Sequence, residues 1–252
     1  MDLRERITDT PRHPWEVVRA RTFCRLATRY APAPATVLDV GSGDSWLVTQ
    51  LLDHLPSSTR VDCWDTHYTA DDLADPPDPR LHRTAERPRT DGTAPYELVL
   101  ALDVLEHIDD DRAFVEDVLA SQVAPGGILV ASVPAQPRLF TRHDIALGHY
   151  RRHSAGSLRD LLSPAFDILA EGSLFASLVP PRAAQRLIEM VRPPEEPVEH
   201  VQSAWRYGPM VTKVVTAVLE ADARVGLATA GKAWRPPGLS VWAVCRRPAD
   251  RG

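Results

Sequence analysis

Two glycines, one residue apart, follow an aspartate near the end of an apolar run. The run begins at Thr36 and contains Asp39, and Gly41, Ser42 and Gly43 follow it. Glycine adopts positive φ angles without strain, and its missing side chain lets a ligand approach the backbone. A strand, a glycine turn and a helix start mark the place where an open α/β sheet holds a nucleotide-like ligand. The segment predicts a ligand-binding turn but leaves several cofactors open.

Two further carboxylates stand where later apolar segments end. Asp65 closes a short apolar segment, and Asp103 closes a longer one. A carboxylate offers two acceptors, which suit the vicinal hydroxyls of a ribose. We predict that Asp65 has this role, with Asp62 as its rival. Asp103 could face the ligand, cap the short helical turn that follows it, or do both.

Histidines are the candidate general bases, because imidazole titrates near neutrality and can accept a proton from a nucleophile. The candidate catalytic residues are His107, His143 and His149. The spacing of His143, His149 and His153 fits no standard zinc pattern, and the three cysteines lie elsewhere. We therefore expect no metal site.

The polar segment from residue 143 to 152 follows the fifth predicted strand and is the predicted substrate side. The candidate substrate-binding residues are Trp15, Arg19, Asp144, Tyr150 and Arg151. Arg151 or Arg152 could hold an anionic group with two hydrogen bonds, or could pair with surface acids.

Apolar periodicity predicts the elements that must position these residues. Strands are expected at 36–40, 61–64, 80–84, 96–102 and 128–133, and helices at 14–30, at 45–55 and from 109 onward. Acids and prolines at 71–80 predict no regular structure there. Later come a helix at 156–163, a strand near 166–174, helices near 178–191 and 205–225, and a strand at 239–245. The alternation of strand and helix predicts a doubly wound parallel sheet whose ligand lies beyond the carboxyl ends of the strands.

Bulk properties exclude several classes of protein. The 252 residues fit one domain, and a net charge of −5 gives no electrostatic reason to expect a nucleic-acid partner. The three cysteines form no CxxC motif, which suits a reducing cytosol. We see no signal peptide and no apolar stretch long enough to span a membrane. The expectation is a cytoplasmic protein of unknown oligomeric state.

Four segments in this order resemble the class I S-adenosylmethionine-dependent methyltransferases. They are Val37–Gly43, Asp65, the segment Leu98–Ile108, and the turn Ala124–Gly127 before the fifth strand. The segment Gly148–Ser154 resembles a bacterial subgroup associated with glycan or natural-product pathways, with His153 where that subgroup has tyrosine. Ser45 stands where a third glycine is common in the family.

The resemblance implies a single α/β domain with a Rossmann-like, seven-stranded sheet and an antiparallel last strand. Residues 1–35 would form an N-terminal helical lid or cap, 36–133 the cofactor-binding half, and 134–252 the substrate-side half with a helical insertion at about 176–235. Trp15 and Arg19 would belong to the lid or anchor a packed helix.

The resemblance also implies a cofactor, S-adenosyl-L-methionine, and roles for the acids. Asp39 would lie near the methionine amino group or cap the glycine turn, Asp65 would bind the ribose, and Asp103 would lie near the methionine part. Glu86 is a weaker candidate for a place beside the adenine. His107 could act as a base or serve packing and cofactor positioning.

The predicted reaction is transfer of a methyl group to an oxygen or nitrogen of a small-molecule acceptor. One alternative is a cyclisation or rearrangement by an enzyme of the same fold, and another is a binding protein that kept the fold. A more remote alternative is an NAD-dependent oxidoreductase, which shares the glycine turn. Against it, Trp46 replaces the third glycine of GxGxxG.

Overall fold

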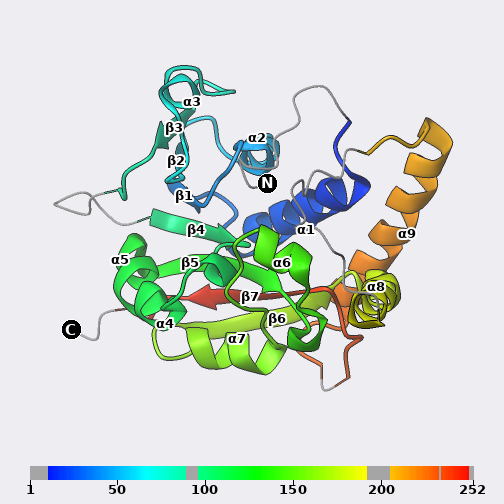
Figure 1. Cartoon of the computed structure of the whole chain (residues 1–252). Helices are drawn as coiled ribbons and strands as arrows, with labels where there is room; N and C mark the ends of the chain where they lie inside the picture. The colour runs from blue at the N-terminus through cyan, green and yellow to red at the C-terminus, as the bar shows by residue number, and fades with distance from the viewer. Residues whose placement is uncertain (1–10, 89–95, 192–204, 233, 250–252) are drawn as a thin grey trace.

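In the computed structural model, the protein consists of a seven-stranded sheet with helices on both faces (Figure 1). The structure describes residues 11–88, 96–191, 205–232 and 234–249. The strand order is β3-β2-β1-β4-β5-β7-β6. The strands are β1 (Thr36–Val40), β2 (Arg60–Trp64), β3 (Leu81–Thr84), β4 (Tyr96–Leu102), β5 (Val123–Pro134), β6 (Asp167–Leu174) and β7 (Ser240–Arg246).

The pairing directions confirm the predicted fold class. Strands β3, β2, β1, β4 and β5 pair in parallel, whereas β7 runs antiparallel to both β5 and β6. The strand order reverses beside β1, since β2 lies on one side of it and β4 on the other. Ligands of open α/β sheets bind at such a reversal, beyond the carboxyl ends of the strands. We call the carboxyl ends of β1, β2 and β4 the carboxyl edge.

Helices cover the sheet in two layers. The helical elements are α1 (Pro14–Tyr30), α2 (Trp46–Leu52), α3 (Ala70–Ala74), η2 (Leu105–His107), α4 (Asp111–Ala113), η3 (Phe114–Leu119), α5 (Ala120–Gln122), η4 (Pro137–Leu139), α6 (Arg142–Ala146), α7 (Ala155–Leu162), η5 (Ala176–Leu178), α8 (Val179–Val191) and α9 (Pro209–Ala228). One apolar cluster joins α1, α2 and α9 to the sheet, and the other joins η3 and α7 to its opposite face.

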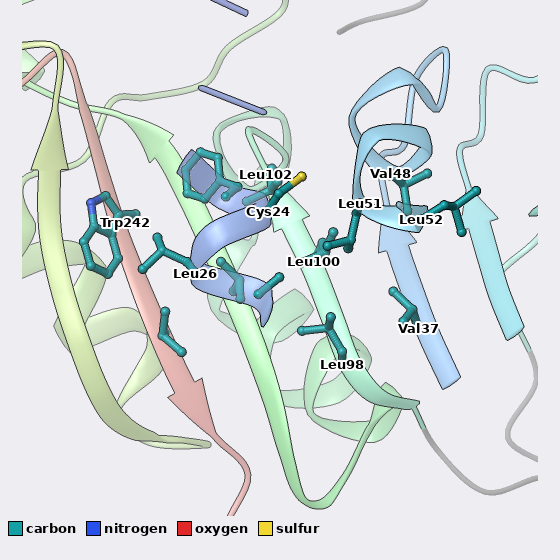
Figure 2. Packing of buried hydrophobic residues seen from close by; sticks show 14 of the residues in the cluster. Cys24, Leu26, Val37, Val48, Leu51, Leu52, Leu98, Leu100, Leu102 and Trp242 are labelled. Atoms are coloured by element: carbon teal, nitrogen blue, oxygen red, sulfur yellow. The ribbon is translucent and has the colours of Figure 1, made fainter. Parts of the chain in front are cut away.

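The apolar runs explain this double cover. In β4, every residue except Glu97 is buried, as expected for a strand with helices on both sides. Figure 2 shows Leu98 and Leu100 of β4 among side chains of α1 and α2, including Leu26 and Leu51. These contacts fix α1 and α2 against one face of the sheet, close to the carboxyl edge.

Four predicted elements differ from the structure. Residues 71–80 were expected to be irregular, but α3 forms there because Thr69 and Asp72 make a capping box. The helix expected from residue 109 begins at Asp111, with Asp110 as its cap. The last long helix begins at Pro209 rather than 205, since proline favours the first helical position. Most other boundaries move by one to three residues, but β5 begins at Val123 rather than residue 128.

A glycine in α9 sets how closely that helix approaches the sheet. A Cβ atom at Gly226 would lie 2.3 Å from the backbone oxygen of Ser173 in β6, whereas one at Gly156 in α7 would only reach the Ser154 hydroxyl at 3.7 Å. Glycine in a helix costs roughly 0.5–1 kcal/mol relative to alanine. At Gly226 the loss from the close contact outweighs the gain in helix propensity from alanine, because overpacking costs about 1–3 kcal/mol.

We therefore predict opposite effects for two substitutions in helices. Gly226→Ala should lower the free energy of unfolding by about 1 kcal/mol or more. Gly156→Ala, the matched control, should leave it unchanged or raise it by up to about 1 kcal/mol. Urea unfolding followed by circular dichroism measures both. Equal stabilisation of the two variants would contradict the close packing of α9 on β6.

Candidate cofactor and active site

The glycine turn leaves β1 in a left-handed conformation. Gly41 has φ +64°, and a Cβ atom there would lie 2.6 Å from the Val104 side chain. Gly43 and Ser45 also have positive φ values, of 54° and 62°. The Gly41 N–H donates to the Trp64 carbonyl at 2.7 Å, which ties the turn to the end of β2. The turn thus needs glycine at 41 for both conformation and space.

Asp39 lies at the bottom of this turn and is nearly inaccessible to water. Burial, together with the nearby carboxylates of Asp65 and Asp44, raises the pKa of its carboxyl group to about 7, against the opposing charge of Arg19. A cationic ligand at the carboxyl edge would favour the ionised carboxylate. The position suits the predicted role of Asp39 beside an amino group.

Asp65 joins the turns after β1 and β2. Its carboxylate accepts from the Gly43 N–H and from the His67 N–H, both at 2.9 Å. Its rival Asp62 is engaged elsewhere, because it accepts from the Tyr96 hydroxyl at 2.6 Å and pairs with Arg60. Asp65 therefore lies at the carboxyl edge, and Asp62 stabilises the interior of the sheet.

A hydroxyl and guanidinium network supports the glycine turn, and sequence reasoning missed it. The Tyr68 hydroxyl lies 2.6 Å from Ser42 Oγ and 2.8 Å from Ser45 Oγ. Arg83 donates to Ser45 Oγ at 3.1 Å and to the Asp44 carbonyl at 2.8 Å. Serine at 45, in place of the third glycine, was the available signal, because its side chain is what the network binds.

Asp103 follows β4 at the same edge and contacts the N-terminal helix. Arg19 Nη2 lies 2.8 Å from Asp103 Oδ2, as an ion pair whose angles do not satisfy those of a hydrogen bond. Ser132 Oγ donates to the other carboxylate oxygen at 3.0 Å. The capping alternative for Asp103 is wrong, because the cap residue of η2 is Val104, which makes no side-chain cap bond. Asp103 (φ 60°) instead directs its carboxylate to Arg19 and Ser132.

Trp15 belongs to the same helix but packs inward. Its ring lies 6.0 Å from that of Phe175 and borders the apolar cluster, and the Arg19 guanidinium lies 5.5 Å from the Trp15 ring. The helix therefore brings Arg19 to the carboxyl edge, while Trp15 anchors the helix.

A second group of side chains lies on η2 and the loop after α6. The rings of His107 and His149 meet edge to face, with centroids 4.6 Å apart. The Tyr150 N–H donates to the Glu106 carbonyl at 2.7 Å, which links the loop to η2. Glu106 is fully buried, and burial raises the pKa of its carboxyl group well above the usual value, as does the nearby charge of Asp103. Sequence reasoning had not placed Glu106 in the site.

Asp144 is the centre of a buried ion-pair network. It accepts from Arg152 Nε at 2.7 Å and from Arg182 Nη2 at 2.9 Å, and it lies 3.2 Å from His149 Nδ1. Burial alone would raise the pKa of Asp144, but the hydrogen bonds from His149 and Arg152 outweigh it and lower the pKa. Protein groups thus engage both carboxylate oxygens, and the network orients His149.

The remaining predicted residues have other partners or face solvent. Arg151 pairs with Asp111 at 2.9 Å, which is the surface pairing that the sequence left open. Tyr150 is largely exposed, and Glu86 is exposed. His143 is half-buried, and burial and the charge of Arg182 lower its pKa. Tyr150 and Glu86 therefore face solvent, and Arg151 has a surface partner.

The comparison with protein families identifies the chain. Residues 15–169, more than half of the sequence, match the model of the methyltransferase domain family. The chain belongs to the methyltransferase domain family. The expected class I S-adenosylmethionine-dependent methyltransferase architecture, with that cofactor, is confirmed at the level of family and fold. No curated protein matches the chain in sequence.

Solved structures share the fold at low sequence identity. The N-methyltransferase NodS from Bradyrhizobium japonicum WM9, in complex with S-adenosyl-L-homocysteine, is 16% identical with a TM-score of 0.57, over 97% of this chain and 95% of that one. The [4+2]-cyclase SpnF is 16% identical with a TM-score of 0.56, over 96% and 85%. A 1,6-didemethyltoxoflavin N1-methyltransferase from Burkholderia thailandensis is 17% identical with a TM-score of 0.52, over 91% and 78%.

Within the part of the chain that the structure describes, no helix has both the length and the apolar character needed to cross a membrane.

The raised pKa of Asp39 predicts a pH-dependent stability. The folded protein holds this proton up to about pH 7, whereas an unfolded chain releases it near pH 4. The stability that Asp39 contributes is thus present below about pH 4 and lost as the pH rises to about 7. Asp39→Asn removes the buried charge and should stabilise the cofactor-free protein near pH 8 by on the order of 2–4 kcal/mol.

Urea unfolding near pH 5 and near pH 8 measures this difference. The advantage of Asp39→Asn over the natural chain should grow between the two pH values. Glu86→Gln, which changes an exposed carboxylate, serves as the matched control and should show no such growth. An advantage that is constant with pH would contradict the assignment to Asp39.

Proposed function

We propose that this protein transfers the methyl group of S-adenosylmethionine to an oxygen or nitrogen of a small molecule. The observation that carries the proposal is the convergence of Asp39, the glycine turn, Asp65 and Asp103 at one edge of the sheet. This edge lies at the reversal of strand order, where open α/β sheets bind their ligands.

Each acid has a distinct role in the proposal. Asp65 binds the ribose hydroxyls, for which its carboxylate retains acceptor capacity beyond its two backbone hydrogen bonds. Asp39 binds the amino group of the methionine part, and that positive charge favours its ionised form. Asp103 lies beside the methionine part, with Arg19 holding its carboxylate in place.

Positioning supplies much of the rate of such a reaction. The sulfonium is already an activated electrophile, so the protein must mainly align the nucleophile, the methyl carbon and the sulfur. Excluding water removes a competing nucleophile. Where the acceptor must lose a proton, His107 and His149 on the η2 side of the edge are the candidate bases, and Asp144 keeps Nε2 of His149 available as an acceptor. His143 stays a prediction as a third base.

The acceptor side is assigned to residues 134–252, including α8 and α9. Arg151, Tyr150 and Trp15 stay predictions as substrate-binding residues. The resemblance of Gly148–Ser154 to a bacterial subgroup supports an acceptor from natural-product or glycan biosynthesis. A cytoplasmic location is part of the same proposal.

A cyclisation or rearrangement is the second candidate function. The [4+2]-cyclase SpnF has a TM-score of 0.56, almost that of the N-methyltransferase NodS. The two reactions differ in their products: methyl transfer releases S-adenosylhomocysteine in step with the methylated product, whereas a cyclisation releases none. Mass spectrometry of reactions with candidate acceptors would separate them.

Asp65→Ala tests the cofactor site. The substitution removes charge-assisted hydrogen bonds to the ribose, each worth roughly 1.5–3 kcal/mol, and should weaken S-adenosylhomocysteine binding by about tenfold or more. Isothermal titration calorimetry measures the affinity. Asp160→Ala, at an exposed carboxylate on α7, is the control and should bind as the natural chain does.

Two calorimetric results would contradict the proposal. Unchanged affinity of Asp65→Ala would remove the ribose assignment. Binding of NADH in preference to S-adenosylhomocysteine by the natural chain would point to the oxidoreductase alternative instead.

A further inference from the structure

Three side chains beside the proposed cofactor site can surround one ion. Glu106 and His107 lie on η2, and His149 lies on the loop after α6. One ligand atom from each, a carboxylate oxygen or an imidazole nitrogen, lies within 4.8 Å of the others. The hydrogen bond from the Tyr150 N–H to the Glu106 carbonyl holds the loop against η2. The three residues, separated by up to 43 positions in sequence, form one cluster in space.

The carboxylate of Glu106 is buried and unsatisfied in hydrogen bonding. Its side chain is fully buried, and among the described residues neither oxygen has a hydrogen-bond partner. A buried carboxylate without hydrogen-bond partners is strongly destabilising, even with the charges of Arg19 and Arg152 nearby. Protonation would remove the charge, but the O–H group of the carboxylic acid would still require a hydrogen-bond acceptor. A bound cation would compensate the charge and engage an oxygen at once.

His149 is oriented as a metal-ligating histidine is. Its Nδ1 lies 3.2 Å from the buried carboxylate of Asp144, which leaves Nε2 as the acceptor nitrogen. Arg152 and Arg182 fix Asp144 in turn. Histidines that bind metals almost always place their other nitrogen against a carboxylate, a backbone carbonyl or a water, and this partner sets the tautomer and the ring orientation.

We propose that Glu106, His107 and His149 form a binding site for a divalent transition-metal ion such as Zn²⁺, Mn²⁺ or Co²⁺. Two imidazoles and one carboxylate suit these ions, whereas Mg²⁺ and Ca²⁺ prefer oxygen ligands alone. Three protein ligands leave coordination positions open for water or a substrate atom. This site departs from the sequence-based expectation of no metal, which rested on spacing within a single segment.

The role of the ion rests on the proposed function, whereas the site itself does not. The ion would bind an acceptor oxygen and lower the pKa of its O–H group. The proton then leaves to solvent, the oxygen bonds to the methyl carbon, and the methyl–sulfur bond breaks with its electron pair left on sulfur. With the ion bound, His107 and His149 are ligands rather than bases.

Cobalt binding tests the site on the full chain without cofactor. The protein is stripped with a chelator and dialysed against Co²⁺, whose visible absorption reports its ligands. We expect about one equivalent per chain for a three-ligand site. Glu106→Gln and His149→Gln should each weaken binding by at least about tenfold, the lower end of the loss usual for residues that only orient ligands. His82→Gln, at an exposed histidine, is the matched control and should bind unchanged.

The outcomes decide the proposal in either direction. No bound Co²⁺, or equal binding in the natural chain, Glu106→Gln and His149→Gln, overturns the site and assigns any binding to surface histidines. If a variant fails to fold, the Tm of the natural chain provides the test. Zn²⁺ should raise this Tm and a chelator should reverse the shift, whereas the absence of a shift overturns the site. Because the assay contains no cofactor, loss of S-adenosylhomocysteine binding would overturn the proposed function alone.

Discussion

The ion pair between Arg19 and Asp103 connects the two parts of the molecule on which the carboxyl edge depends. Arg19 comes from α1, which packs on one face of the sheet, and Asp103 comes from the end of β4. Both side chains are largely removed from water, so the pair is stable only while α1 stays against the sheet. The packing of Leu26 and Trp15 therefore fixes a charge at the carboxyl edge.

This arrangement leaves the edge rich in carboxyl groups with little exposure to water. Asp39, Asp65, Asp103 and Glu106 lie near one another, and burial raises the pKa of Asp39 and of Glu106. Arg19 acts on both raised carboxyl groups in the opposite sense. Such an environment favours cationic ligands, because a positive charge restores the ionised carboxylates. The proposed cofactor, with its sulfonium and amino groups, and the proposed metal ion both meet this requirement.

Much of the cofactor side was predictable because its residues are close in sequence to the strands that carry them. The ends of β1, β2 and β4 place Asp39, Asp65 and Asp103 at one edge, as alternation of strand and helix implies. Only the serine at position 45 gave a sequence signal for the network of Tyr68, Ser45 and Arg83. Its members come from separate turns and strands, and nothing in their spacing indicates that they meet.

The sequence by itself determined the fold class, the glycine turn and the acids that follow the strands, because apolar periodicity and local turn chemistry act over a few residues. Only the tertiary structure decided which partners those acids have. It turned Asp103 to Arg19, gave Asp62 to Tyr96, and closed Glu106, His107 and His149 into one cluster. The physical reason is burial: the pKa of a carboxyl group, and its need for a partner, depend on side chains that distant segments bring around it.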